Sequence, residues 1–190
     1  MTTMKKAFVI GIAGGSASGK STFSEKLKEA LCGVEVLELH MDSYFKPESE
    51  RQMVEAPISG KVYRDDNHPS SFDLEELKSD LSKALRDGQT EVVIIEGLLT
   101  LWDQDIYNQL DLRLFVECRA DERIVRRLKR NMKRGLKFDE IADVYLDFVR
   151  YRHDEYVEPT KWRADFIING SNFSDKAIKI IVNYVKGMVR

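Results

Sequence analysis

A glycine- and serine-rich stretch near the start of the chain, GIAGGSASGKSTF at residues 11–23, constrains the fold more than any other feature. It follows the apolar run AFVI and leads into the helix-like run SEKLKEAL, so a strand, a tight loop and a helix are expected in succession. The spacing Gly-x-x-x-x-Gly-Lys-Ser satisfies the Walker A pattern. A glycine-rich turn with a chance Lys-Ser pair is the alternative, but the context favours a site for a nucleoside triphosphate.

The residue types of this loop suit phosphate chemistry. Small residues let backbone N–H groups approach phosphate oxygens, and the start of the helix adds its positive dipole end. Lys20 can reach the β- and γ-phosphates, and the Ser21 hydroxyl can ligate Mg²⁺. The residues predicted to bind the nucleotide are Gly14, Gly15, Ser16, Ala17, Ser18, Gly19, Lys20, Ser21 and Thr22.

Apolar runs and helical patterns alternate along the rest of the chain. Strands are expected at residues 7–13, 34–39, 92–97, 112–117 and 165–168, and helices at 20–31, 73–86, 121–134, 139–157 and 174–186. Continuous apolar strands alternating with helices predict an α/β fold with a parallel sheet covered on both faces, which places ligands at the carboxyl ends of the strands. We expect one domain over residues 1–190, with a long irregular stretch at 42–71.

Composition excludes several classes of protein. A net charge of −2 and a pI near 6.0 are atypical of nucleic-acid binding, so a nucleic-acid partner is not expected. No segment approaches the length of about 18 apolar residues that a membrane helix needs. The start of the chain is interpreted as a first strand rather than a signal peptide. Two distant cysteines suit a reduced, cytoplasmic setting, and the sequence leaves a homo-oligomer open.

Two acids follow predicted strands at the ligand edge. Asp42, in HMDSYF, could accept a proton from a substrate hydroxyl as that oxygen attacks phosphorus, or could simply cap a turn. Glu96 ends VVIIEG, where an acid commonly holds Mg²⁺ directly or through water, although a surface acid at a strand end is the alternative.

A basic stretch at residues 119–137 holds nine basic residues against two acids. At helical spacing one face carries Arg123, Arg127, Arg130 and Arg134, and Ile124, Val125, Leu128 and Met132 occupy the other. The basic face could be solvated, or could form a lid that brings guanidinium groups to the transferred phosphoryl group. RNA contact is a third reading, disfavoured by the low pI and the absence of aromatic residues among the arginines. The phosphate motif favours the lid.

Six motifs together resemble a known family. GIAGGSASGKSTF, MDSYF, NHPSSFD, IIEGLL, RRLKRNMKRG and VEPTKWRADFII occur in the order and spacing of the uridine/cytidine kinases of the phosphoribulokinase/uridine kinase group. The resemblance implies a five-stranded parallel sheet of the P-loop NTPase fold, similar to nucleoside monophosphate kinases, with a basic lid at about residues 127–138. It also implies ATP and Mg²⁺ as cofactors and a ribose hydroxyl as acceptor.

The resemblance also implies roles for individual residues. Asp42 matches the catalytic base, with Lys20, Arg127 and Arg130 supporting the transferred charge. Ser21 and Glu96 match positions associated with magnesium, Asp42 is a further candidate for binding the metal, and Arg134 matches a lid arginine that contacts phosphates. The residues expected to bind the acceptor are Asp42, Tyr44, Phe45, Asp66, Asn67, His68 and Arg127, of which Tyr44, Phe45 and His68 are named for their place in the long irregular stretch.

Three departures from the family motifs leave the identity of the acceptor undecided. The Asp-His-Pro of the family is Asn67-His68-Pro69 here, with Asp66 one place earlier, and Arg-Gly-Arg is Arg134-Gly135-Leu136. The β-hairpin by which uridine kinases read the pyrimidine has no counterpart between Arg86 and VVIIEG. DSYFKPESE also resembles nicotinamide riboside kinases, so a kinase of that type or of another small alcohol is the alternative. A non-catalytic nucleotide-binding or RNA-associated protein is the alternative of another class.

Overall fold

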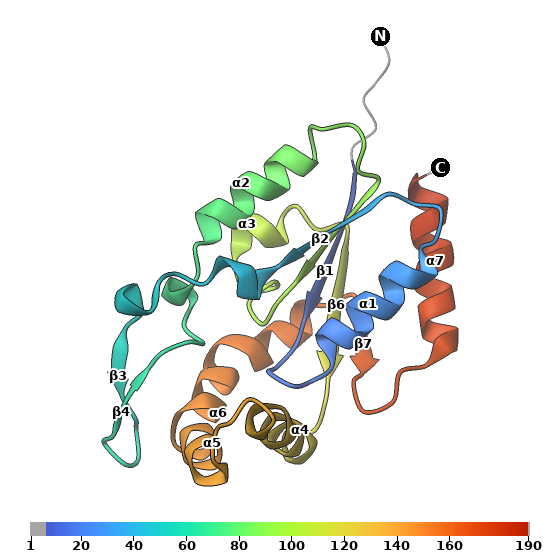
Figure 1. Cartoon of the computed structure of the whole chain (residues 1–190). Coiled ribbons are helices and arrows are strands. Elements are labelled where there is room, and N and C mark those ends of the chain that lie inside the picture. The colour runs from blue at the N-terminus through green and yellow to red at the C-terminus, as the bar shows by residue number, and fades with distance from the viewer. Residues whose placement is uncertain (1–6, 190) are drawn as a thin grey trace.

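The computed structural model describes residues 7–189 and contains a parallel sheet at its centre (Figure 1). Its five strands are β1 (Phe8–Ala13), β2 (Val36–His40), β5 (Val92–Glu96), β6 (Leu112–Glu117) and β7 (Phe166–Asn169), in the spatial order β2-β5-β1-β6-β7. All neighbouring strands of this sheet are parallel. The five-stranded parallel sheet predicted from the sequence is therefore confirmed. Residues 1–6 of the start that was interpreted as a strand lie outside the described residues.

Helices cover both faces of the sheet because side chains of the central strands alternate between two buried clusters. Phe8, Ile10 and Ile12 of β1 join the cluster under α1 (Lys20–Ala30) and α7 (Asp175–Val189). Val9 and Ala13 join the opposite cluster under α2 (Leu74–Ala84) and the short α3 (Gln104–Tyr107). This double burial explains why the strands appear in the sequence as continuous apolar runs.

The basic stretch forms α4 (Ala120–Met132), which crosses the end of the sheet below the phosphate loop (Figure 1). The single helix expected at 139–157 is interrupted. It consists of α5 (Phe138–Val144), a π-helical turn η4 (Tyr145–Val149), α6 (Arg150–Arg152), a second π-helical turn η5 (His153–Val157) and a 3₁₀ segment, η6 (Glu158–Arg163). Turns of this kind are frequent at functional sites.

The stretch at 42–71 is more ordered than the sequence suggested. It contains the 3₁₀ turns η1 (Met41–Tyr44), η2 (Glu48–Glu50) and η3 (Pro69–Ser71), and a hairpin of β3 (Met53–Glu55) and β4 (Val62–Arg64). With three residues in each strand, the hairpin was too short to stand out as an alternating pattern. The connection from α2 to β5 carries no hairpin, as the sequence predicted.

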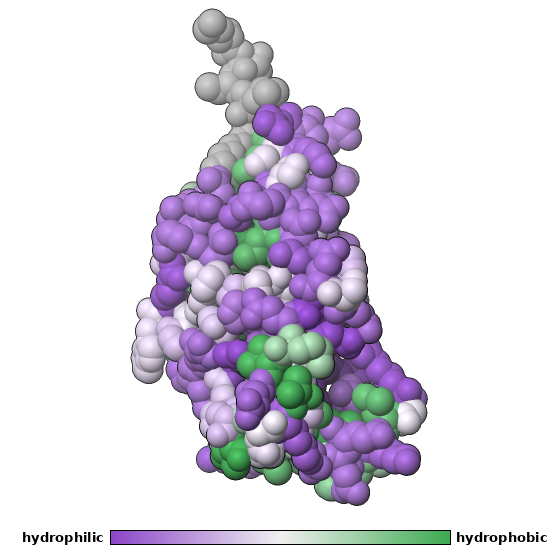
Figure 2. Space-filling view, turned by 90° about the vertical axis from the view of Figure 1, so that its left-hand side faces the viewer, coloured by the Kyte–Doolittle hydropathy of each residue, from purple (hydrophilic) through white to green (hydrophobic). Residues whose placement is uncertain are grey.

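The face with the β3–β4 hairpin is mainly hydrophilic, with hydrophobic side chains gathered low on it (Figure 2). Met53, Ile58 and Val62 of the hairpin are among the exposed large hydrophobic residues. Within residues 7–189, no helix combines the length and apolar character required to cross a membrane.

Candidate active site

The phosphate loop joins the end of β1 to the start of α1. Gly19 precedes the helix with a φ of 99°, and Ala17 adopts a φ of 64°, which is uncommon for a residue with a side chain. The Ser18 side chain is fully buried and its hydroxyl has no hydrogen-bond partner within the protein. The loop is thus held in a conformation of the kind that clusters at ligand-binding sites.

Lys20 and Glu96 meet beneath this loop. The Lys20 ammonium lies 3.5 Å from Oε1 of Glu96, and both residues are buried. His40 lies beside Glu96 in the strand register, and its Nδ1 is 3.3 Å from Oε2 of that carboxylate. Oε1 makes no hydrogen bond, and the Lys20 ammonium is its ionic partner, so this buried carboxylate oxygen keeps the capacity to accept a hydrogen bond from a water molecule beside the loop.

The predicted magnesium residues are not a preformed cage. Ser21, on the first turn of α1, and Asp42, on η1, are both exposed, in contrast to Glu96. In the described part of the chain, no group of three or more His, Cys, Asp or Glu residues could hold a metal ion. Mg²⁺ usually keeps several waters and binds through one or two carboxylates together with the phosphates of a nucleotide, so Glu96 and Ser21 could take part in such a site.

Two of the predicted lid arginines reach the phosphate loop. Arg127 donates from Nη1 to the Ser16 hydroxyl over 3.1 Å, and Arg130 donates from Nη2 to the same oxygen over 3.4 Å. Burial lowers the pKa of both guanidinium groups from the usual value, and each is lowered further by a neighbouring arginine. Asp42 lies close enough to act in the opposite direction on the pKa of Arg130. Two cations therefore face the loop where a phosphate would balance their charge.

Two other arginines of the predicted basic face, Arg123 and Arg134, are placed differently from the sequence prediction. Arg134 is exposed beyond the helix end and makes no described hydrogen bond to the loop. Arg123 is buried, donates from Nε to the Cys118 carbonyl, and lies under Gly15. Val125 and Met132, expected on the apolar face, are about half exposed because α4 packs on the loop through its arginines.

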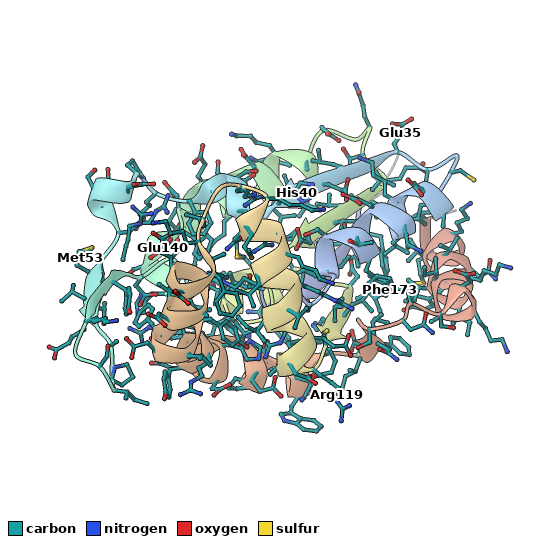
Figure 3. All side chains as sticks on the ribbon, turned by 60° about the horizontal axis from the view of Figure 1, so that its bottom comes forward. Glu35, His40, Met53, Arg119, Glu140 and Phe173 are labelled. Carbon is teal, nitrogen blue, oxygen red and sulfur yellow. The ribbon has the colours of Figure 1, made fainter. Side chains whose placement is uncertain are left out.

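A cavity of about 560 Å³ adjoins the phosphate loop. Arg126, which the sequence analysis did not single out, forms part of its wall and donates from Nη1 to the carbonyls of Ser18 and Gly170. Figure 3 shows Phe173, another wall residue, on the far side of α4 from Met53 of the hairpin. The cavity lining is Ala17, Gly19, Lys20, Ser21, Thr22, Arg126, Arg130, Gly170, Ser171 and Phe173.

On the acceptor side, several predicted residues have partners within the protein. The Tyr44 hydroxyl donates to Asp80 over 3.1 Å, and burial together with this carboxylate raises the pKa of Tyr44 to about 12. The Phe45 ring stacks on Phe72 with centroids 4.3 Å apart. These two side chains hold the chain after Asp42 against α2, a contribution to the architecture of the site.

The polar residues further along the acceptor side are also engaged. Asp66 pairs with Arg51 at 3.0 Å and with Arg64 at 3.1 Å. The Nδ1 of His68 accepts the Ser70 amide over 3.1 Å, which leaves Nε2 as the second polar atom of the ring. The backbone amide of Asn67 donates to Asp65, a fully buried acid that sequence reasoning passed over in favour of its neighbour.

The chain matches the family described as Phosphoribulokinase / Uridine kinase family over residues 9–90 and 75–177. A uridine kinase of Clostridium tetani is 34% identical and the alignment covers 98% of each chain. A uridine kinase of Anoxybacillus flavithermus is 32% identical, with 96% of this chain and 95% of that protein covered. The Clostridium alignment spans 209 positions against the 190 residues of this chain, so at least 19 positions have no counterpart here.

Solved structures show the same fold. A possible uridine kinase from Bacillus stearothermophilus superimposes with a TM-score of 0.54 at 19% identity, covering 85% of this chain and 88% of that one. A putative fructose transport system kinase from Silicibacter superimposes with a TM-score of 0.61 at 17% identity, covering 88% and 92%.

Proposed function

Because this chain belongs to the phosphoribulokinase/uridine kinase family, we propose that it transfers a phosphoryl group from ATP to a hydroxyl group of a small nucleoside-like substrate. The observation that carries the proposal is the convergence on one loop of Lys20, paired with the buried Glu96, and of Arg127 and Arg130. Phosphoryl transfer depends mainly on positioning and on stabilising charge, and these groups supply both.

Each of these residues has a distinct task in the proposed reaction. ATP supplies the phosphoryl group, and Mg²⁺ neutralises charge on its phosphates. Lys20 turns from Glu96 to the phosphates, which leaves the Glu96 carboxylate and the exposed Ser21 hydroxyl to hold the cation or its waters. Arg127 and Arg130 stabilise the charge that develops on the transferred group. Asp42 orients the acceptor hydroxyl and takes its proton.

The cavity beside the phosphate loop is the proposed site for the base of the nucleotide. Its floor is the phosphate loop itself, and its wall includes Gly170, Ser171 and Phe173. The Phe173 ring offers an aromatic face for stacking, a contact that every nucleobase can make.

The segment in which the family resemblance implies a pyrimidine-reading hairpin contains no hairpin in this structure. The connection between α2 and β5 is short, and at least 19 positions of the Clostridium uridine kinase have no counterpart in this chain. We therefore propose a kinase of a nucleoside-like hydroxyl substrate, with uridine and cytidine as first candidates. A nicotinamide riboside or another small alcohol is the second candidate, favoured by the same missing segment.

The test is ADP release from ATP and Mg²⁺ with a panel of uridine, cytidine, nicotinamide riboside, pantothenate and other small alcohols. We expect one acceptor to raise ADP release well above the rate with ATP alone. Release at the background rate for all acceptors, together with salt-sensitive RNA binding, would instead support the RNA-associated alternative.

A variant tests the role of Asp42. Replacing the general base should lower turnover by about 10²- to 10⁴-fold, so Asp42→Asn is expected to lose most activity and still bind ATP. Asp139→Asn, at an exposed carboxylate on the first turn of α5, is the matched control and should retain activity. Near wild-type turnover by Asp42→Asn on the identified acceptor would refute the assignment of the base.

A further inference from the structure

Asp65 is a fully buried carboxylate that the reaction described above does not use. Its Oδ1 accepts the backbone amides of Asn67 and His68 over 3.1 and 3.0 Å. Its Oδ2 accepts Nε of Arg152 over 2.7 Å. One carboxylate therefore shapes the turn at residues 67–69, called here the acceptor turn, and fastens it to α6, which lies 87 residues further along the chain.

Arg152, the partner of Asp65, packs against two aromatic rings. Its guanidinium carbon lies 5.2 Å from the ring centroid of Phe148 and 5.7 Å from that of Tyr156. The Tyr156 ring in turn packs edge-on against His68, with centroids 5.1 Å apart. The arginine side chain is only 17% exposed and also pairs with Glu155 at 2.5 Å, so removing Arg152 leaves the buried Asp65 carboxylate without its charge partner.

The β3–β4 hairpin is fastened along the same helical segment. Tyr63 of β4 packs on Phe148 with ring centroids 5.9 Å apart, and the backbone amide of Ser59 donates to Asp147 over 3.2 Å. The ion pair between Asp65 and Arg152 adds a contact between the same helical segment and the acceptor turn. Between α2 and β5, no hairpin is present that could support this side of the site instead.

The residue after Arg152 contacts the other half of the site. A Cβ atom on Gly15 would lie 2.9 Å from Cε1 of His153, so this imidazole packs directly under the phosphate loop. Consecutive residues of one helical turn thus touch the acceptor turn, through Asp65, and the donor loop. The π-helical turns on both sides of α6 are where the backbone accommodates this double contact.

We propose that Asp65 and Arg152 form a positioning pair that sets the acceptor turn at its working distance from the phosphate loop. The inference deepens the proposed function and rests on it for the role of the turn in binding the acceptor. Neither residue touches the reacting atoms. The pair acts through Asn67 and His68, so its loss displaces the acceptor and leaves the nucleotide site in place.

Kinetics with uridine and with nicotinamide riboside as acceptors test this proposal. Asp65→Asn keeps an oxygen for the turn amides and removes the charge, and Arg152→Met removes the guanidinium at similar length. Each is expected to raise the KM for the acceptor at least tenfold, with the KM for ATP changed less than twofold. The double variant removes the buried, unpaired carboxylate that Arg152→Met leaves, so its acceptor KM should lie below that of Arg152→Met. Arg86→Met, at an exposed arginine just after α2, is the matched control and should keep both KM values.

A second measurement needs no acceptor. Hydrogen exchange of the amides of residues 66–68 and 70 should be at least tenfold faster in Arg152→Met than in the wild type, with residues 11–24 unchanged. Unchanged exchange at the turn overturns the positioning pair even if no acceptor is turned over. An equal rise of both KM values, or an acceptor KM within twofold of wild type in both single variants, also overturns it. Faster exchange with no activity on any acceptor would instead count against the proposed function.

Discussion

His153 is expected to make the stability of this protein depend on pH. The imidazole is 9% exposed, its Nδ1 has no hydrogen-bond partner, and the Arg123 guanidinium lies beside it under Gly15. Burial, reinforced by the charge of Arg123, lowers the pKa of His153 from 6.5 to about 4, although Glu158 and Asp154 act in the opposite direction. The folded protein therefore keeps this ring neutral at a pH where an unfolded chain protonates it.

The sign and size of the effect follow from these two values. Because the pKa is lower in the folded state, the unfolded state binds the proton first as the pH falls. The contribution to stability is complete above pH 6.5 and is lost progressively as the pH falls towards 4. At pH 5 the loss is about 2 kcal/mol, and it approaches about 3 kcal/mol below pH 4, from 1.36 kcal/mol for each unit of pKa.

Urea unfolding at pH 7.5, 6.0 and 5.0, for the wild type and for His153→Asn, measures this contribution. The variant loses packing at every pH, so the informative quantity is the change in unfolding free energy between pH 7.5 and 5.0. That change should be smaller in His153→Asn by about 2 kcal/mol. Val149→Ala, a buried control in the preceding π-helical turn, should be less stable but keep the wild-type pH dependence. Equal pH dependence in the wild type and His153→Asn would refute the reasoning.

Two further expectations concern the nucleotide site. A Cβ atom on Gly170 would lie 2.3 Å from the Ser18 carbonyl, so Gly170→Ala should push the cavity wall from the phosphate loop and weaken ATP binding at least tenfold, measured by calorimetry. The control Gly187→Ala, in α7 with nothing within 4 Å of the new methyl group, should bind ATP normally and be more stable by about 0.5–1 kcal/mol in urea unfolding. Arg127→Met should lower kcat at least 100-fold with little change in melting temperature, because the guanidinium that reaches Ser16 is lost; an unchanged kcat would contradict its place in the lid.

Local sequence patterns were sufficient for the sheet and the phosphate loop. The strands around Ile10 and Ile94 are continuous apolar runs because both faces are buried, and the loop residues follow each other directly in the chain. The position of Glu96 at a strand end was likewise readable, since the carboxyl ends of parallel strands meet at one edge.

The sequence predicted the partners of individual side chains much less well than it predicted the sheet. The acidic pair at residues 65 and 66 has two equivalent members in the sequence, and only folding buries the first and exposes the second to pairing with Arg51 and Arg64. The basic face of α4 was predicted as four arginines, yet Arg134 lies past the helix end and Arg126 reaches the loop instead. Helical periodicity predicts which residues share a face of a helix. The angle at which the helix crosses its neighbours decides which residues of that face make contact.

The sequence by itself therefore determined the phosphate loop, the segment proposed to bind the nucleotide, because it is one contiguous stretch whose conformation depends little on the rest of the chain. It also determined the fold, since periodicity reports burial. Only the tertiary structure decided how the acceptor side is built. Its contacts join residues as far apart as Asp65 and Arg152, and no local pattern records which distant charge a buried carboxylate will meet.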